Sequence, residues 1–279
     1  MHERVTVVVM SRDRRDELVH TLARHETPVV LVDNGSTDGT VDAVRSLVPD
    51  ATVVALPVNR GAPARNIGVR LAGTPYVAFA DDDSWWAAGA LARAVELLDA
   101  HPRVALLAAR VLVGPEERED PANRTMAAAP LGHEPDLPGP SILGFLACGV
   151  VVRRSAFLEV GGFDDVVFFH GEEERVALDL AAAGWGLAYV PELVVHHHPS
   201  PARDLRSRAA LMVRNRVLVA VQRRPWRVVA HEVGRAVRSG RAGRAGARAA
   251  LRRVPRALAD RRRLPGPVER ARLRLDEPA

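Results

Sequence analysis

Residues 76–86 read Tyr-Val-Ala-Phe-Ala-Asp-Asp-Asp-Ser-Trp-Trp, and this stretch decides the fold. Apolar, β-prone residues lead without a break into three adjacent carboxylates, Asp81, Asp82 and Asp83. A strand buried on both faces has this pattern, and its carboxyl end is where open α/β sheets bind their ligands. Three neighbouring carboxylates favour a hard divalent cation, which prefers oxygen ligands. An acidic, solvated turn is the other interpretation of such a triplet.

Strand-like and helix-like segments alternate on both sides of this stretch. Predicted strands lie at 5–10, 29–32, 52–56, 104–109, 187–190 and 193–196, and predicted helices at 13–23, 41–47, 62–71, 87–98 and 176–183. This alternation predicts an α/β fold with a mainly parallel central sheet and helices on both faces. The proline-rich residues 114–140 interrupt the pattern and predict a long mobile loop.

Composition narrows the class of protein. The chain has 279 residues, of which 47% are hydrophobic and 26% charged, as in soluble globular proteins. It has no apolar run of the roughly 18 residues that a membrane span needs, and its first residues do not resemble a signal peptide. The single cysteine, Cys148, excludes an internal disulfide and suits a reducing compartment. We therefore expect a cytoplasmic protein.

Charge is distributed unevenly along the chain. Residues 203–279 carry 22 arginines and 6 acidic residues, whereas residues 1–202 carry 17 arginines and 28 acidic residues. The basic part predicts an Arg-rich helical extension whose last portion, within 240–279, is poorly ordered. Its helix at 204–222, followed by Pro225 and Trp226, suggests an element that lies on an anionic membrane surface. A packed helix with a solvated arginine face is the alternative.

Two polar segments precede the Asp triplet. Asp33 and Ser36 follow the second predicted strand, where they form either a simple turn or a contact to a nucleotide. Gly61 precedes a helix that carries Arg65 and Asn66, and a helix start of this kind attracts phosphate. Neither a dinucleotide-binding glycine fingerprint nor a phosphate-loop motif is present, which argues against nicotinamide or flavin binding and against ATP hydrolysis.

Two further clusters follow the triplet. Residues 172–174 are three glutamates before an apolar helix; the helix dipole favours them there, and one of them could serve as a general base. Residues 196–198 are three consecutive histidines. Because side chains alternate along a strand, His196 and His198 lie on one face and His197 on the other. That pair could complete a metal site with the triplet, although a solvated cluster or a zinc hydrolase also fits.

The order of these motifs resembles family 2 of the inverting glycosyltransferases, which have the GT-A fold, and rhamnosyltransferase-like bacterial members in particular. The resemblance covers roughly residues 4–200. It rests on the segments 32–39, 59–68, 79–83, 153–157, 161–164, 171–173, 183–185, 189–191 and 196–197. It implies a glycosyltransferase domain at 1–202, with a donor-binding half at 1–110 and an acceptor-binding half at 111–202, followed by the basic extension at 203–279.

The resemblance also implies site residues. Those expected at the nucleotide-sugar donor are Ser11, Asp33, Asn34, Ser36, Arg65, Asn66, Asp81 and Asp82. Those expected at Mg²⁺ or Mn²⁺ are Asp81, Asp83 and His196. Glu173 would be the base that deprotonates an acceptor hydroxyl, but it stands where the family has aspartate, so Glu172 or Glu174 remain alternatives.

The implied partners are a nucleoside-diphosphate sugar and a glycan or lipid-linked acceptor, at the inner face of a plasma membrane. Two other functions stay open. A member that binds nucleotide-sugars without turnover is one, and a nucleic-acid-binding protein that uses the arginine tail is the other, although the acidic body and the few aromatic residues in the tail argue against nucleic acid.

Overall fold

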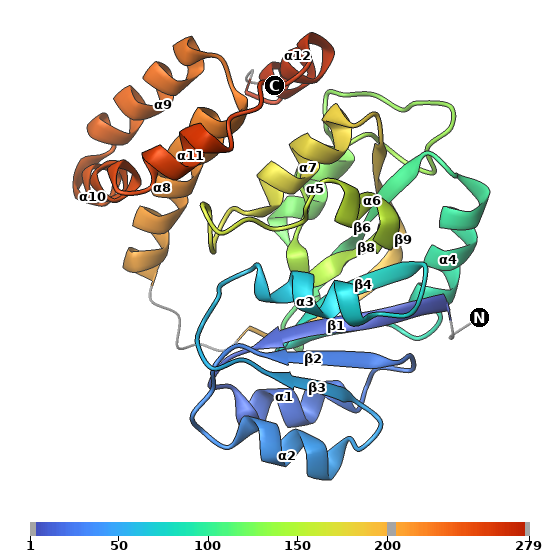
Figure 1. Ribbon diagram of the computed structural model, residues 1–279. Helices are drawn as coiled ribbons and strands as arrows, with labels where there is room; N and C mark the ends of the chain where they lie inside the picture. Colours follow the sequence, from blue (N-terminus) through green and yellow to red (C-terminus); the bar gives the residue numbers. More distant parts are fainter. Residues whose placement is uncertain (1–3, 200–204, 277–279) are drawn as a thin grey trace.

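The computed structural model describes residues 4–199, called here the body, and residues 205–276, called the C-terminal helical region (Figure 1). The strands are β1 (Val5–Ser11), β2 (Val29–Asp33), β3 (Thr52–Ala55), β4 (Tyr76–Asp81), β5 (Ser84–Trp86), β6 (Val104–Val113), β7 (Arg118–Glu119), β8 (Val150–Arg153) and β9 (Gly186–His197). The helices of the body are α1 (Arg15–Leu22), α2 (Thr40–Leu47), α3 (Ala64–Leu71), α4 (Ala90–Ala100), α5 (Pro121–Ala127), the short 3₁₀ helix η2 (Ala147–Gly149), α6 (Arg154–Glu159) and α7 (Glu173–Ala182).

One mixed sheet forms the centre of the body, in the order β3-β2-β1-β4-β8-β6-β9-β5, with β7 paired to β6. The strands β3, β2, β1 and β4 are parallel, as the sequence predicts. Beyond β4 the pairing is mixed, because β8 runs antiparallel to both of its neighbours and β5 runs antiparallel to β9. The carboxyl ends of β1, β2 and β4 therefore meet at one edge.

Strand alternation divides the core into two layers. On β4, Tyr76, Ala78 and Ala80 pack in the layer that includes α1, α2 and α4. Val77 and Phe79 pack in the opposite layer, with α3, α6 and α7. All five side chains are buried, which explains why this strand is apolar at every position up to Asp81. The prediction of helices on both faces is confirmed.

Three predictions about the elements need correction. First, residues 114–140 are not one long loop, because β7 and α5 lie within them. The side chain of Asp120 caps α5 by accepting a hydrogen bond from the Ala122 amide at 2.8 Å, and Pro121 occupies the first turn of this helix. The two strands predicted at 187–190 and 193–196 are one strand, β9, whose register against β6 shifts between Ala109 and Arg110.

The third correction concerns residues 240–276, which are largely helical although the last portion of 240–279 was expected to be poorly ordered; residues 277–279 lie outside the described residues. The C-terminal helical region consists of α8 (Leu205–Arg223), α9 (Trp226–Arg238), α10 (Gly240–Leu251), α11 (Val254–Ala259) and α12 (Gly266–Arg274). The first residue of the helix predicted at 204–222, Asp204, lies outside the described residues. Among the described helices, none has the length and apolarity to span a lipid bilayer.

The C-terminal helical region packs against the body through α8. Val219 of α8 lies in a buried cluster with Leu143, Val167 and Leu178, and a second cluster joins Val166 to the helices α8 to α11. The predicted alternative of a packed helix therefore applies to α8.

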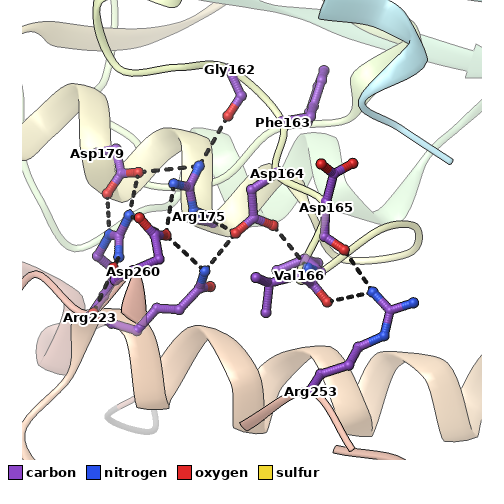
Figure 2. A network of polar contacts seen from close by, with 12 residues as sticks. Gly162, Phe163, Asp164, Asp165, Val166, Arg175, Asp179, Arg223, Arg253 and Asp260 are labelled. Carbon is purple, nitrogen blue, oxygen red and sulfur yellow. Dashed lines mark hydrogen bonds and ion pairs between the residues drawn. The ribbon is translucent and has the colours of Figure 1, made fainter. Parts of the chain in front are cut away.

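Ion pairs reinforce this packing (Figure 2). Arg175 of α7 contacts Asp164 at 3.1 Å and Asp260 at 3.2 Å. Arg223 of α8 donates to Asp179 of α7 at 2.5 Å and also contacts Asp260 at 3.3 Å. These charges are mostly buried, so each needs its partner to remain inside the protein.

The buried pair of Arg224 and Glu269 provides a test of how firmly α12 is docked. Arg224 Nε donates to Glu269 Oε2 at 2.6 Å, and both residues are buried. We expect Arg224→Ala to lower the free energy of unfolding by about 3–5 kcal/mol, because Glu269 would stay buried without a cation. Arg93→Ala, which breaks an exposed pair with Glu192, is the control and should cost at most about 1 kcal/mol. Equal small effects in chemical denaturation would show that α12 is not held in this position.

Candidate active site

Polar side chains from three parallel strands gather at the edge where the strands end. Ser11 ends β1 and Asp33 ends β2, and the two residues are paired across these strands. Asp81 ends β4, paired with the residue before Ser11. Ser11 Oγ donates to Asp82 Oδ2 at 2.9 Å. The structure therefore brings these predicted residues together because parallel strands end at a common edge.

Asp33 is prepared to accept further hydrogen bonds. It is 2% exposed, and its Oδ2 accepts from the Ser36 amide at 3.1 Å. Its Oδ1 is buried and has no hydrogen-bond partner among the described residues. A buried acceptor oxygen without a partner is costly, so Asp33 fits contact with an N–H or hydroxyl group of a ligand.

Asn34 and Asn66 have other contacts. Asn34 Oδ1 accepts from the Arg60 amide at 2.7 Å, which ties the end of β2 to the loop before α3. Asn66 bonds to both backbone atoms of Phe163, since Oδ1 accepts from its amide at 3.0 Å and Nδ2 donates to its carbonyl at 2.7 Å. These contacts hold the two side chains against neighbouring loops, and the donor contacts that the resemblance implies for them stay a prediction.

The three aspartates have different partners. Asp81 accepts from Arg65 at 2.5 Å, Asp82 from Ser11, and Asp83 Oδ1 lies 3.1 Å from His197 Nε2. Burial and the neighbouring charges of Asp83 and Asp81 raise the pKa of Asp82 to about 7. The triplet is thus a set of carboxylates with separate environments, rather than a solvated turn.

Arg65 connects the triplet to the glutamates at the start of α7. Its side chain is 3% exposed, and its Nη1 lies 3.8 Å from Glu172 Oε1, while its Nη2 donates to Asp81. Burial and the charge of Glu173 raise the pKa of Glu172 to about 8, and burial also raises the pKa of Glu173. The two acidic clusters that the sequence singles out therefore belong to one site.

Glu174 is separated from this site by its own partner. Its Oε1 accepts from Arg272 Nε of α12 at 2.7 Å. Of the three glutamates that the sequence left as candidates for the base, Glu174 is thus committed to an ion pair with the C-terminal helical region.

The histidine nearest the triplet is His197, whereas the sequence prediction named His196. β9 pairs with β5 so that His196 lies opposite Trp85 and His197 opposite Ser84. The His196 and His198 rings both contact the Trp85 ring, with centroids 5.3 and 4.7 Å away, as the predicted shared face requires. That face points away from the triplet, and His196 Nδ1 lies 3.1 Å from Glu117 Oε1. Alternation was correct, but the register with β5 decides which face meets Asp83.

Cys148 is a residue that sequence reasoning missed. It lies in η2 and is buried, and its sulfur belongs to a group with ligand atoms of Asp81 and His197 that all lie within 4.8 Å of one another. Burial and then the charges of Asp81 and Asp83 raise the pKa of the thiol well above its usual value. The sequence offered no signal for this contact, because a lone cysteine in an apolar segment matches no metal-binding motif.

This set of side chains fits a divalent cation. A carboxylate oxygen of Asp81, the Cys148 sulfur and an imidazole nitrogen of His197 lie within 4.8 Å of one another, and Asp83 Oδ1 lies 3.1 Å from His197 Nε2. Carboxylate oxygens suit Mg²⁺ and Mn²⁺, and imidazole is a further metal ligand.

Comparison with known proteins identifies the class. Residues 6–161 match Glycosyl transferase family 2, and the chain belongs to this family. Its fold is the GT-A fold, with the helical C-terminal region added, as the sequence predicts.

Two relatives from Mycobacterium tuberculosis are similar in sequence. The chain is 34% identical over 225 residues to a pre-mycofactocin glycosyltransferase; the match covers 75% of the chain but only 46% of that relative. It is 30% identical over 217 residues to an N-acetylglucosaminyl-diphospho-decaprenol L-rhamnosyltransferase, covering 65% of the chain and 70% of that relative.

Solved structures show the same architecture. The mannosyltransferase PcManGT from Pyrobaculum calidifontis, in complex with GDP-Man and Mn²⁺, has a TM-score of 0.61 and 25% identity, covering 92% of this chain and 74% of its own. TarS 1-349 from S. aureus, in complex with UDP-GlcNAc, has a TM-score of 0.62 and 15% identity, covering 98% and 88%.

The two neighbouring histidines allow a direct test of the metal position. We expect His197→Ala to weaken Mn²⁺ binding by about 10-fold or more, because it removes the imidazole beside Asp83. His196→Ala, on the opposite face of the same strand, is the matched control and should leave the affinity within about twofold. Calorimetric titration of Mn²⁺ in the presence of a nucleoside diphosphate measures both. A larger loss in the His196 variant would restore the original assignment.

Proposed function

We propose that this protein is a metal-dependent, inverting glycosyltransferase that moves a sugar from a nucleoside-diphosphate donor to an acceptor hydroxyl in cell-envelope or polysaccharide synthesis. The observation that carries the proposal is the buried Arg65, which lies between Asp81 of the triplet and Glu172 of the acidic pair. The reaction needs one acidic cluster at the leaving diphosphate and another at the acceptor, and Arg65 joins two such clusters in one site.

The donor side of the proposal rests on residues 1–110. Asp33, with its unsatisfied buried oxygen, would accept hydrogen bonds from the base or ribose, next to Ser11 and Ser36. Asp83 and His197, with Asp81, would hold Mg²⁺ or Mn²⁺, and the Mn²⁺ in the structure of PcManGT supports the use of such an ion. When bound, the cation would neutralise charge that grows on the leaving diphosphate.

The acceptor side rests on residues 111–202, where Glu173 is the proposed base. Glu174 is paired with Arg272 and Glu172 faces Arg65, so Glu173 is the glutamate least committed to an arginine. Burial raises the pKa of Glu173, which makes its carboxylate a stronger proton acceptor. Removal of that proton from the face opposite the leaving group gives a single displacement, which inverts the anomeric centre.

The relatives and structural neighbours suggest which classes of donor and acceptor this protein uses. Neighbouring structures hold GDP-Man or UDP-GlcNAc, and one relative is named as a rhamnosyltransferase acting on a decaprenol-linked sugar. We propose a hexose or deoxyhexose such as rhamnose, and a glycan or lipid-linked acceptor. Thermal shift with a panel of nucleotide-sugars and Mn²⁺ would identify the donor, because a ligand that binds the folded state raises the melting temperature.

The identity of the base is testable with two isosteric variants. We expect Glu173→Gln to lower kcat by about 10²- to 10⁴-fold with donor affinity nearly unchanged, because it removes proton acceptance alone. Glu172→Gln should have the smaller effect on kcat. Steady-state kinetics with the identified donor and acceptor measure both. The reverse order would make Glu172 the base, and full turnover in both variants would contradict the acceptor-side mechanism.

A non-catalytic binder of nucleotide-sugars is the second candidate, since glutamate replaces the family's aspartate at position 173. Product analysis distinguishes this non-catalytic binder from a glycosyltransferase. Binding of a donor with Mn²⁺ and no transfer to any acceptor would favour it, whereas transfer that is lost in Asp83→Ala would exclude it.

We also propose that α9 and α10, rather than α8, contact an anionic membrane surface from the cytoplasmic side. The exposed residues of α9 include an apolar row, Trp226, Ala230, Val233 and Val237, which helical spacing places on one face. Exposed arginines flank it on α9 and α10, at positions 227, 238, 241, 244 and 248. Such a surface suits binding to anionic lipid.

Vesicle sedimentation tests this surface. We expect binding to vesicles that contain phosphatidylglycerol and little binding to pure phosphatidylcholine. The double substitution Val233→Asp and Val237→Asp should reduce binding at least 10-fold, whereas Leu47→Asp, at an exposed position on α2, should not. Salt-sensitive retention on nucleic acid without vesicle binding would favour the nucleic-acid alternative instead.

A further inference from the structure

The segment that leads into α7 has a strained backbone. Residues 164–171 form no helix or strand, and they end directly before Glu172 and Glu173. Phe168 and His170 have φ values of 71° and 68°, in the left-handed region that residues other than glycine rarely adopt. Such a conformation persists only where the surroundings hold it.

The surroundings hold it through its backbone carbonyls. Every carbonyl from Asp165 to His170 accepts a hydrogen bond from another part of the chain. The donors are Arg253 for residues 165 and 166, Arg214 for 167, the Ala62 amide for 168, and Asn215 for 169 and 170. All of them except Ala62 belong to the C-terminal helical region.

Asn215 of α8 makes the contacts closest to the glutamates. It is 0% exposed, and its Nδ2 donates to the carbonyls of Phe169 at 2.7 Å and His170 at 2.6 Å. These carbonyls belong to the two residues before Gly171. Without this amide the two partly buried carbonyls would lose the hydrogen bonds that it donates, which is costly.

The start of the segment is held by the same helices. The Asp164 carboxylate accepts a hydrogen bond from Gln222 of α8 at 2.5 Å. It also contacts Arg175, and Arg253 donates to the carbonyls of Asp165 and Val166 (Figure 2). The segment is therefore fixed at both ends by side chains from α8 and from the junction of α10 and α11.

The middle of the segment contacts the donor side of the site. The Ala62 amide donates to the Phe168 carbonyl at 2.7 Å. A Cβ on Gly61 would lie 2.5 Å from that carbonyl oxygen, and Gly61 has a φ of 65°, so only glycine fits here. Ala62 lies just before α3, which carries Arg65, so the segment links the start of α3 to the start of α7.

We propose that the C-terminal helical region fixes residues 165–170 and thereby positions Glu172 and Glu173 against Arg65, with Asn215 as the principal positioning residue. This inference rests on the proposed function for its catalytic consequence. The region is then part of the catalytic unit, although none of its residues needs to touch substrate. Loss of the Asn215 amide would make residues 165–170, which lead to Glu173, more mobile. The sheet edge of β1, β2 and β4, where the donor is proposed to bind, would stay in place.

The test compares Asn215→Asp and Asn215→Ala with Met212→Ala, a substitution at an exposed position of the same helix. Asparagine and aspartate have the same shape, but aspartate cannot donate to the two carbonyls. We expect both Asn215 variants to lower kcat by about 10- to 100-fold, since small misplacements of catalytic groups have effects of this size. The KM for the donor should stay within about twofold, and Met212→Ala should match wild type.

Hydrogen exchange supplies a readout that does not depend on activity. We expect the amides of residues 166–172 to exchange at least 10-fold faster in the Asn215 variants, while the strands β1 and β4 keep their protection. Arg253→Ala, which removes the donor to residues 165 and 166, should give a milder form of the same pattern.

Two outcomes would overturn the inference. One is unchanged exchange and unchanged kcat in the Asn215 variants. The other is faster exchange across the whole sheet in the Asn215 and Arg253 variants alike, which would mean that the contacts only stabilise the fold. If wild type transfers no sugar, the proposed function fails, and the exchange pattern alone still decides whether the C-terminal helical region orders the segment.

Discussion

The site depends on one buried guanidinium. Arg65 lies on the first turn of α3 with its side chain almost fully buried, and it faces Asp81 on one side and Glu172 on the other. A buried cation is stable only when anions surround it, and buried carboxylates are stable as anions only near a cation. The same interaction therefore brings α3, the end of β4 and the start of α7 together, although they are far apart in sequence.

A second constraint is the balance of charge between the body and the C-terminal helical region. The sequence shows an acidic body and an arginine-rich tail, which suggested a surface for an anionic partner. Part of that difference is neutralised within the protein, because Arg223 pairs with Asp179 and Arg272 with Glu174. Other arginines of this region stay exposed, among them those on α9 and α10 that the membrane proposal uses.

The C-terminal helical region packs into the body and contributes to the segment next to the proposed site. Residues 203–279 read as an appendage in the sequence, yet α8 contributes buried apolar residues and hydrogen-bond donors to the loop before α7. That loop forms no regular secondary structure, so its backbone carbonyls need hydrogen-bond donors from other parts of the chain. Side chains of the C-terminal helical region supply most of them.

Local patterns explain which predictions succeeded. The apolar run before Asp81, the helix spacings and the polar turns after β1 and β2 depend on neighbours in the sequence, and these elements lie where the sequence predicts. The helix α5 was missed because the high proline content outweighed the signal of Asp120 as a cap and Pro121 in the first turn. The strand β9 was divided in two because Pro191 and Glu192 interrupt its apolar pattern.

The sequence by itself determined the alternation of strands and helices, the Asp triplet at a strand end and the glutamates at the start of a helix, because the spacing of apolar and acidic residues encodes each of them; the GT-A fold came from the resemblance of its motif order to a known family. Only the tertiary structure decided that His197, and not His196, meets Asp83, that Cys148 lies beside Asp81, and that Asn215 holds the loop before Glu173. These contacts join residues that are distant in sequence, and strand register and helix docking set them. No local pattern carries that information.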